Sequence, residues 1–174
     1  MRVTPMRLAI AAFASVAVIS GCAGQPKQEK NVEQGKATAA APAQQTYHND
    51  MEQYTLTYPA SWNARVQPQD TNVWQGKALL DAENVVVFSY VEIDNGSQSK
   101  PLLALAVYDK ATYDRLTSEV GTDMPSSQVV ATHANKVLVA YRNANNPYDP
   151  ASFHGQQYAR RQVGLDTLKA GLQW

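Results

Sequence analysis

Hydrophobic and polar positions divide the 174-residue chain into three parts. Apolar and small residues run without a break from Leu8 to Ile19, whereas residues 23–46 are mostly polar and contain no aromatic side chain. After residue 46, apolar side chains return at the spacings of strands and helices. This division predicts a leader at residues 1–21, a linker at residues 22–46 and a single folded domain at residues 47–174.

Strand patterns dominate the predicted domain. Apolar side chains at every second position of 54-YTLTYP-59 predict a strand with one buried face. Pro59 ends this strand, and we expect Trp62 to pack beneath the turn. A short edge strand is predicted at residues 64–69. Two antiparallel hairpins follow, one formed by residues 85–93 and 101–109 and the other by residues 127–134 and 136–143.

Two helices complete the prediction. Residues 110–120 carry apolar side chains at helical spacing, with Asp109 or Thr112 as the N-cap and Gly121 as the stop. Residues 151–173 predict one amphipathic C-terminal helix, which two glycines weaken. The expected fold class is therefore α+β, a twisted antiparallel sheet with helices packed against it.

The stretch 54-YTLTYPASWN-63, at the opening of the predicted domain, resembles the PsbP-like family. The family has a Tyr-Pro-x-x-Trp signature, which Tyr58, Pro59 and Trp62 match, and the order of predicted elements is similar. The resemblance implies an α/β/α sandwich, a fold that also occurs in bacterial lipoproteins. It further implies an accessory or assembly role rather than an enzymatic one, and it supplies no catalytic residues.

The N-terminal apolar run has the layout of a secretory signal. Arg2 and Arg7 precede it, and residues 1–21 contain no acidic side chain. A membrane-spanning helix needs about 20 apolar residues, so a run of about a dozen is too short for a permanent span.

Ile19-Ser20-Gly21-Cys22 resembles the lipobox of bacterial lipoproteins. The resemblance implies attachment of a diacylglyceryl group to the Cys22 sulfur, cleavage before Cys22 and, in many bacteria, acylation of the new amino group by a fatty acid such as palmitate. Cys22 is the only cysteine, so lipidation would leave no thiol for disulfide, zinc or redox chemistry. The alternative is an ordinary signal peptide that happens to contain a cysteine.

The residues after Cys22 bear on the membrane in which the protein resides. Ala23, Gly24 and Gln25 include no aspartate of the kind that retains lipoproteins in the inner membrane. By that resemblance we expect the outer membrane, facing the periplasm, if the host is Gram-negative; a Gram-positive host would place the protein on its single membrane. As a random coil, the linker would reach roughly 25–30 Å.

Charge and motifs exclude several function classes. The chain has 15 basic and 15 acidic residues, and loss of Arg2 and Arg7 with the leader leaves a net charge of −2. Without a basic stripe, we expect no nucleic-acid partner. His48, His133 and His154 lack metal-binding spacing, and the chain contains no nucleophile elbow, P-loop or dinucleotide motif. No cofactor and no metal are therefore expected.

The segment 141-YRNANNPYDPAS-152 is the candidate surface for binding a partner. Tyr, Asn and Arg are common recognition residues, and two prolines lower the entropy cost of ordering the loop. Asn-Pro and Asp-Pro also start turns, and Asp149 or Ser152 could simply cap the last helix. The candidate partner-binding residues are Tyr141, Arg142, Asn145, Asn146, Tyr148 and Asp149.

Three functions remain open from the sequence. The leading hypothesis is a non-enzymatic envelope lipoprotein that binds another envelope protein in assembly or maintenance. The second is a module that binds a small ligand or cell-wall glycan, with Trp62, Trp74 and Trp174 available for stacking. The third is a hydrolase in which folding brings Glu92 and Asp94 near His133.

Overall fold

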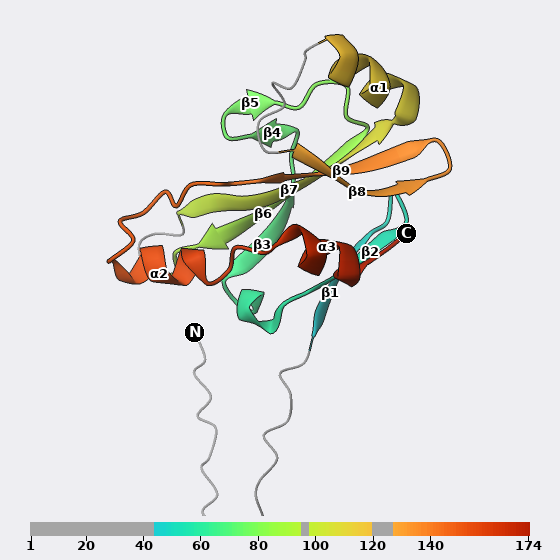
Figure 1. Ribbon diagram of the computed structural model, residues 1–174. Helices are drawn as coiled ribbons and strands as arrows, with labels where there is room; N and C mark the ends of the chain where they lie inside the picture. The colour runs from blue at the N-terminus through green and yellow to red at the C-terminus, as the bar shows by residue number, and fades with distance from the viewer. Residues whose placement is uncertain (1–43, 95–97, 120–126) are drawn as a thin grey trace, which may run out of the picture. The chain divides into compact units, whose positions relative to one another are not determined.

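The computed structural model describes residues 44–94, 98–119 and 127–174, all within the compact unit Ala40–Trp174. These residues form ten strands, three α-helices and one short 3-10 helix (Figure 1). In chain order they are β1 (Gln45–Asn49), β2 (Tyr54–Tyr58), η1 (Ala60–Trp62), β3 (Val66–Asp70), β4 (Val73–Trp74), β5 (Lys77–Ala78), β6 (Asn84–Val91), β7 (Ser99–Asp109), α1 (Lys110–Glu119), β8 (Ser127–His133), β9 (Lys136–Arg142), α2 (Phe153–Ala159), α3 (Leu165–Gly171) and β10 (Leu172–Gln173).

A five-stranded antiparallel sheet forms the centre of the fold, with the strand order β3-β6-β7-β9-β8. The predicted hairpins β6–β7 and β8–β9 are confirmed, and β3 is the predicted edge strand. Pro68 lies on β3 opposite Phe88, where an edge position tolerates a residue that cannot donate a backbone hydrogen bond. The α+β fold class is confirmed.

A second, three-stranded sheet has the order β1-β2-β10. The predicted alternation in β2 is confirmed, since Tyr54 and Leu56 are buried and the residues between and after them are half-buried. β1 begins at Gln45, two residues inside the predicted linker, and no strand was predicted there. Strand β10, the last element of the described unit, pairs with β2, so the first and last strands of that unit lie in one small sheet.

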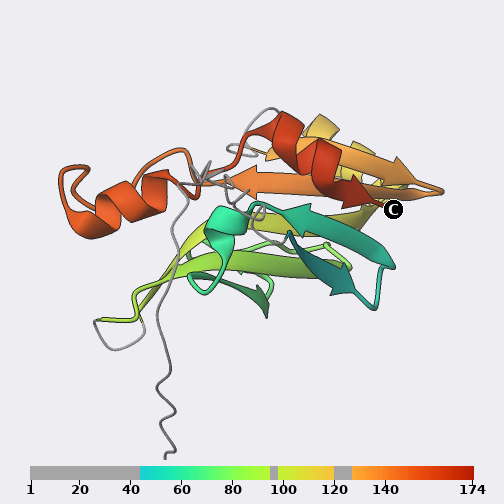
Figure 2. The ribbon, with the colours of Figure 1, turned by 90° about the horizontal axis from the view of Figure 1, so that it is seen from below.

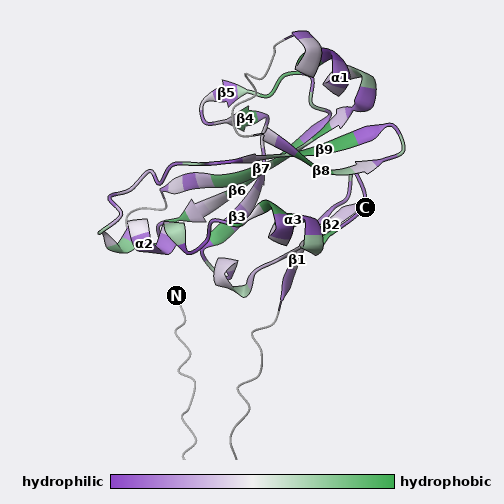
Figure 3. Cartoon of the chain, viewed as in Figure 1, coloured by the Kyte–Doolittle hydropathy of each residue, from purple (hydrophilic) through white to green (hydrophobic). Residues whose placement is uncertain are grey.

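The central sheet is buried on both faces, because successive side chains of a strand point to opposite sides. On β6, Val86, Phe88 and Tyr90 face the first core, which contains β2, Trp62 and residues of α2 and α3. Val85 and Val87 face the second core, which α1 and the β4–β5 hairpin cover. Figures 1 and 2 show these covering elements on opposite sides of the sheet, and Figure 3 shows hydrophobic residues concentrated along its inner strands.

Of the two residues predicted as the N-cap of α1, Asp109 and Thr112, the structure has Asp109 in that position. The Asp109 carboxylate accepts hydrogen bonds from the backbone N–H groups of Ala111 and Thr112, at 2.9 and 3.3 Å. The predicted stop at Gly121 lies outside the described residues. None of the described helices is long and apolar enough to cross a membrane.

The predicted single helix over residues 151–173 is wrong. The segment forms α2, an irregular connection at residues 160–164, then α3 and β10. Gly164 has an extended backbone (φ −74°, ψ 159°) as the N-cap of α3. The indole N–H of Trp62 donates to the Arg161 carbonyl at 2.7 Å, a bond that holds the connection against η1 instead of within a helix.

Candidate functional site

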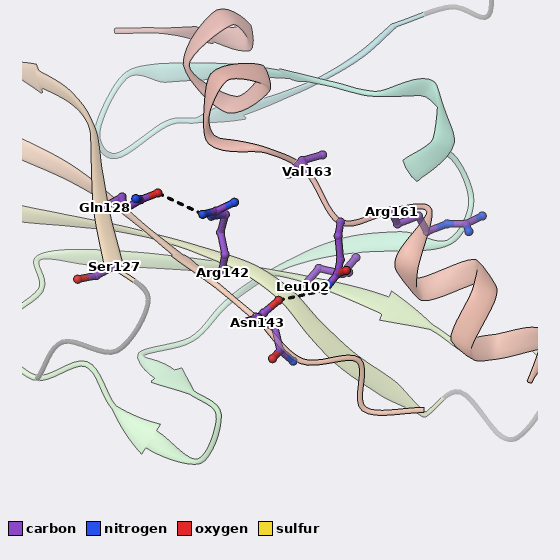
Figure 4. A pocket seen from close by; sticks show the side chains of 9 residues that line it. Leu102, Ser127, Gln128, Arg142, Asn143, Arg161 and Val163 are labelled. Carbon is purple, nitrogen blue, oxygen red and sulfur yellow. Dashed lines mark hydrogen bonds between the residues drawn. The ribbon is translucent and has the colours of Figure 1, made fainter. Parts of the chain in front are cut away.

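A cavity of about 380 Å³ lies between one end of the central sheet and the α2–α3 connection (Figure 4). Its volume falls within the range of ligand pockets, roughly 300–1,000 Å³. Four chain segments contribute to the wall: β7, the start of β8, the end of β9 with the residues that follow, and the α2–α3 connection. The lining residues are Leu102, Ser127, Gln128, Arg142, Asn143, Ala144, Arg161, Gln162 and Val163.

A β-bulge on β7 aims Leu102 at this cavity. Phe88 pairs with Leu103 while Ser89 pairs with Pro101, so Leu102 is an extra residue in the ladder. As a result, Leu102 and Leu103 both pack in the first core, which a regular pleat would not allow. The bulge thereby supplies an apolar wall in a cavity that otherwise has mostly polar side chains.

Arg142 supplies the charge inside the cavity. Its Nη2 donates to the Gln128 side-chain oxygen at 3.2 Å, and its buried Nε has no hydrogen-bond acceptor among the described residues. Within the described ranges, Arg142 has no ion pair and the cavity wall contains no carboxylate. Among the residues that the structure describes, no group compensates this positive charge.

The second arginine at the wall is turned elsewhere. Figure 4 shows the Arg161 side chain extending away from Arg142, and its guanidinium lies 5.5 Å from the centre of the Tyr90 ring. Burial lowers the pKa of Arg161, and repulsion from Arg65 and Arg160 lowers it further. Arg161 thus contributes its backbone and the aliphatic part of its side chain to the cavity wall. The positive charge inside the cavity comes mainly from Arg142.

Hydrogen bonds fix the opposite wall and the loop at residues 143–152. The Gln162 side chain donates to the Asn143 carbonyl at 3.0 Å, joining the α2–α3 connection to the end of β9. Asn146 accepts from the Tyr148 backbone N–H at 3.1 Å and donates to the Gly155 carbonyl at 2.8 Å. The predicted turns are therefore present, and the loop is braced on both sides.

Tyr148 anchors this loop to the sheet through a cluster of polar and aromatic side chains. Its hydroxyl donates to a Glu92 carboxylate oxygen at 2.6 Å, and the other oxygen lies 4.0 Å from His154 Nε2. The second nitrogen of His154 is 2.9 Å from the Tyr90 hydroxyl. Burial raises the pKa of Tyr148, and the bond to Glu92 raises it further, so the hydroxyl keeps its proton and remains a donor.

One predicted partner-binding residue is misplaced and the others lie around the cavity and its loop. Tyr141 belongs to β9 and is 2% exposed, because its parity in the strand directs it into the second core. Its hydroxyl is 2.8 Å from that of Tyr108, so its ring cannot contact a partner at the surface. Asn145 and Asp149 are exposed, whereas Arg142, Asn146 and Tyr148 are partly buried.

The predicted hydrolase set is not assembled by the fold. Glu92 contacts Tyr148 and His154, neither of which was its predicted partner. His133 instead stacks on Trp174, with ring centres 5.7 Å apart. Asp94 lies 3.9 Å from Arg65.

The three tryptophans do not form a common groove. Trp62 packs in the first core, as predicted, and Trp74 packs in the second core on the other face of the sheet. Trp174 is docked, with its indole N–H donating to the Glu52 carbonyl at 2.7 Å. His48, the remaining histidine, contacts Thr55 and Asp50 at the surface.

Several cavity residues had no signal in the sequence. Gln128, Gln162 and Leu102 are ordinary strand or loop residues, and only folding brings them around Arg142. Asn143 belongs to the segment 141–152 that the sequence singled out. In the part of the chain that the structure describes, no group of three or more His, Cys, Asp or Glu side chains could hold a metal ion. Cys22, the predicted lipidation site, lies outside the described residues.

Comparisons with protein-family models, curated proteins and solved structures found no match to this chain.

Proposed function

We propose that the protein is a lipid-anchored lipoprotein of the cell envelope that has no enzymatic activity and binds another envelope protein at the Arg142 cavity. The observation that carries this proposal is the guanidinium of Arg142, which has no ion-pair partner within residues 44–94, 98–119 and 127–174 and lies in a cavity of about 380 Å³. Leaving a charge unpaired in a partly buried site is costly, so such a group is more readily explained by a ligand than by stability.

The sequence supports the location. Ile19-Ser20-Gly21-Cys22 would be the processing and lipidation site, and residues 23–46 would be the tether. In a Gram-negative host we propose the outer membrane, with the domain facing the periplasm. Stable anchoring takes more than one acyl chain, which the triacylated cysteine of a mature lipoprotein would provide.

The resemblance to the PsbP-like family supports a binding role. Trp62, from its signature, is buried and holds the α2–α3 connection that forms one wall of the cavity. We propose a PsbP-like sandwich, since helices cover both faces of the central sheet. A small ligand in the same cavity is the second candidate function, favoured by the cavity volume.

Site-specific photo-crosslinking in cells tests the proposal. A photoreactive amino acid at Asn145, which is exposed and next to the cavity residue Ala144, should capture one dominant envelope protein. The matched control is Leu80, which is 70% exposed and belongs to the segment beside the second core. Equal capture from both positions, or reproducible capture from neither, would contradict the proposed interface.

The anchor is tested separately by Cys22→Ser. We expect this variant to lose incorporation of labelled palmitate and to leave the washed membrane fraction. A variant that keeps both properties would show that Cys22 is not the anchor.

A further inference from the structure

Resting on the proposed function, we infer that the Arg142 cavity recognises the C-terminal carboxylate of a polypeptide, namely the chain end of the partner. Charge complementarity is the starting point. The one cation that points into the cavity lacks an anionic partner among the described residues, and the wall there has no acidic side chain. A ligand that carries a negative charge would complete this site.

The donor geometry favours a carboxylate. Arg142 has a planar fork of N–H donors that fits two carboxylate oxygens. Its Nη2 bond to the Gln128 amide oxygen is long, at 3.2 Å, whereas a guanidinium–carboxylate bond is typically 2.7–2.9 Å. Gln128 therefore orients the guanidinium through a weak bond that a stronger acceptor can replace or share.

The rest of the wall fits a peptide better than an inorganic anion. Leu102 and Val163 offer apolar surface, and Gln128, Asn143 and Gln162 contribute amide groups. Apolar walls with a few polar groups are typical of sites that bind an organic ligand. With Arg161 turned away, there is a single guanidinium, which suits one carboxylate rather than a multiply charged phosphate.

The size of the cavity favours a chain end over a side chain in the middle of a polypeptide. At about 30 Å³ per water molecule, its volume of about 380 Å³ corresponds to roughly a dozen waters, which is room for the last few small residues of a chain. An internal aspartate or glutamate would bring chain on both sides into the same space. Capture of a C-terminal carboxylate is also a recurring mode of peptide recognition.

Titration of the full-length, ¹⁵N-labelled protein in detergent tests the inference. The probes are N-acetyl-Ala-Ala with a free carboxylate, the same dipeptide as its amide, and N-acetyl-Ala-Asp-Ala-amide. For a ligand of about 14 non-hydrogen atoms we expect a Kd on the order of 1 mM for the free acid. The backbone signals of Gln128, Asn143 and Val163 and the Nε–H signal of Arg142 should shift, and both amides should bind at least about tenfold more weakly.

Two variants assign the effect to Arg142. Arg142→Gln should weaken binding of the free acid at least about tenfold. Arg160→Gln, the matched control, removes the same charge from an exposed residue outside the cavity wall and should leave binding unchanged.

Three outcomes would overturn the inference: no shifts with the free acid up to about 20 mM, equal binding of acid and amides, or unchanged binding by Arg142→Gln. If Asn145 still captures a partner under any of these outcomes, the proposed function stands without the carboxylate. If the free acid binds as expected but Asn145 captures nothing, the carboxylate chemistry stands and the protein partner fails.

Discussion

Replacing Tyr148 with phenylalanine removes one hydroxyl from the contact that holds the 143–152 loop against the sheet. That hydroxyl donates to Glu92 at 2.6 Å. The Glu92 side chain is only 6% exposed, and its other oxygen is 4.0 Å from His154, so water does not readily replace the lost donor. The variant leaves a buried carboxylate short of a hydrogen bond.

The expected cost follows from the type of bond. Hydrogen bonds to charged groups contribute about 1.5–3 kcal/mol, so Tyr148→Phe should lower the free energy of unfolding by about 2 kcal/mol. For a domain of this size, that loss corresponds to a fall in Tm of roughly 5–10 °C. Combining Tyr148→Phe with Glu92→Gln removes the buried charge as well, and the two variants should couple by at least about 1 kcal/mol.

Thermal unfolding of the full-length protein in detergent, followed by near-ultraviolet circular dichroism at pH 7, measures this loss. The matched control is Tyr58→Phe, because the Tyr58 hydroxyl donates at 3.1 Å to Gln45, which is exposed. We expect that control to change stability by less than about 0.5 kcal/mol. The loop is not anchored by the Tyr148–Glu92 bond if Tyr148→Phe lowers the free energy of unfolding no more than Tyr58→Phe does. The same conclusion follows if the effects of Tyr148→Phe and Glu92→Gln are simply additive.

Three further predictions concern other parts of the domain. Burial raises the pKa of Tyr158 from 10.0 to about 12, so the contribution of Tyr158 to stability is complete below pH 10 and should be lost between pH 10 and 12. In urea titrations, Tyr158→Phe should reduce the loss of unfolding free energy with pH in this range by up to about 1.4 kcal/mol per pH unit, and an unchanged slope would refute this. In the same assay, Gly155→Ala should lower the free energy of unfolding by about 2 kcal/mol, because a Cβ would overlap the Asp149 carbonyl. Gly164→Ala places its Cβ in open space and should lower it by less than about 1 kcal/mol; equal losses would contradict this difference in packing. Arg142→Gln should lower the free energy of unfolding by no more than about 0.5 kcal/mol and should raise it if the unpaired charge is costly, since Arg142 makes no ion pair among the described residues. A loss above about 2 kcal/mol would assign Arg142 a structural role.

The strands were predictable where the pattern is local. Alternation in 54–58 and the apolar runs at 85–93, 101–109 and 136–143 depend on neighbouring residues, and each coincides with a strand of the structure to within two residues at its end. The short strands β4, β5 and β10 were not predicted, because two residues carry no period. Their pairing is set by tertiary contacts.

The C-terminal segment shows why helical spacing alone was insufficient. Apolar residues keep a helix-like spacing across Gly164, yet the chain turns there to dock on η1. The connection is held by Trp62, about 100 residues earlier in the chain. Within residues 151–173 the sequence offered only the helix-weakening Gly155 and Gly164, which do not say where the chain turns.

The candidate site was predictable only in part. Arg142 and the loop after it were identified from composition, but the cavity depends on a bulge at Leu102 and on the α2–α3 connection, neither of which has a local signature. Tyr141 was assigned to the wrong environment because strand parity was not followed to the end of β9. Ala140 faces the first core, so its neighbour had to face the second.

The most direct test of the central claim is the yield of photo-crosslinking from Asn145 in cells, compared between the otherwise unchanged protein and its Arg142→Gln variant at equal abundance in the membrane. If the cavity is the binding site, the dominant captured protein should fall at least about tenfold in the variant. An equal yield of the same protein would contradict the claim, because the partner would then bind without the Arg142 guanidinium that points into the cavity.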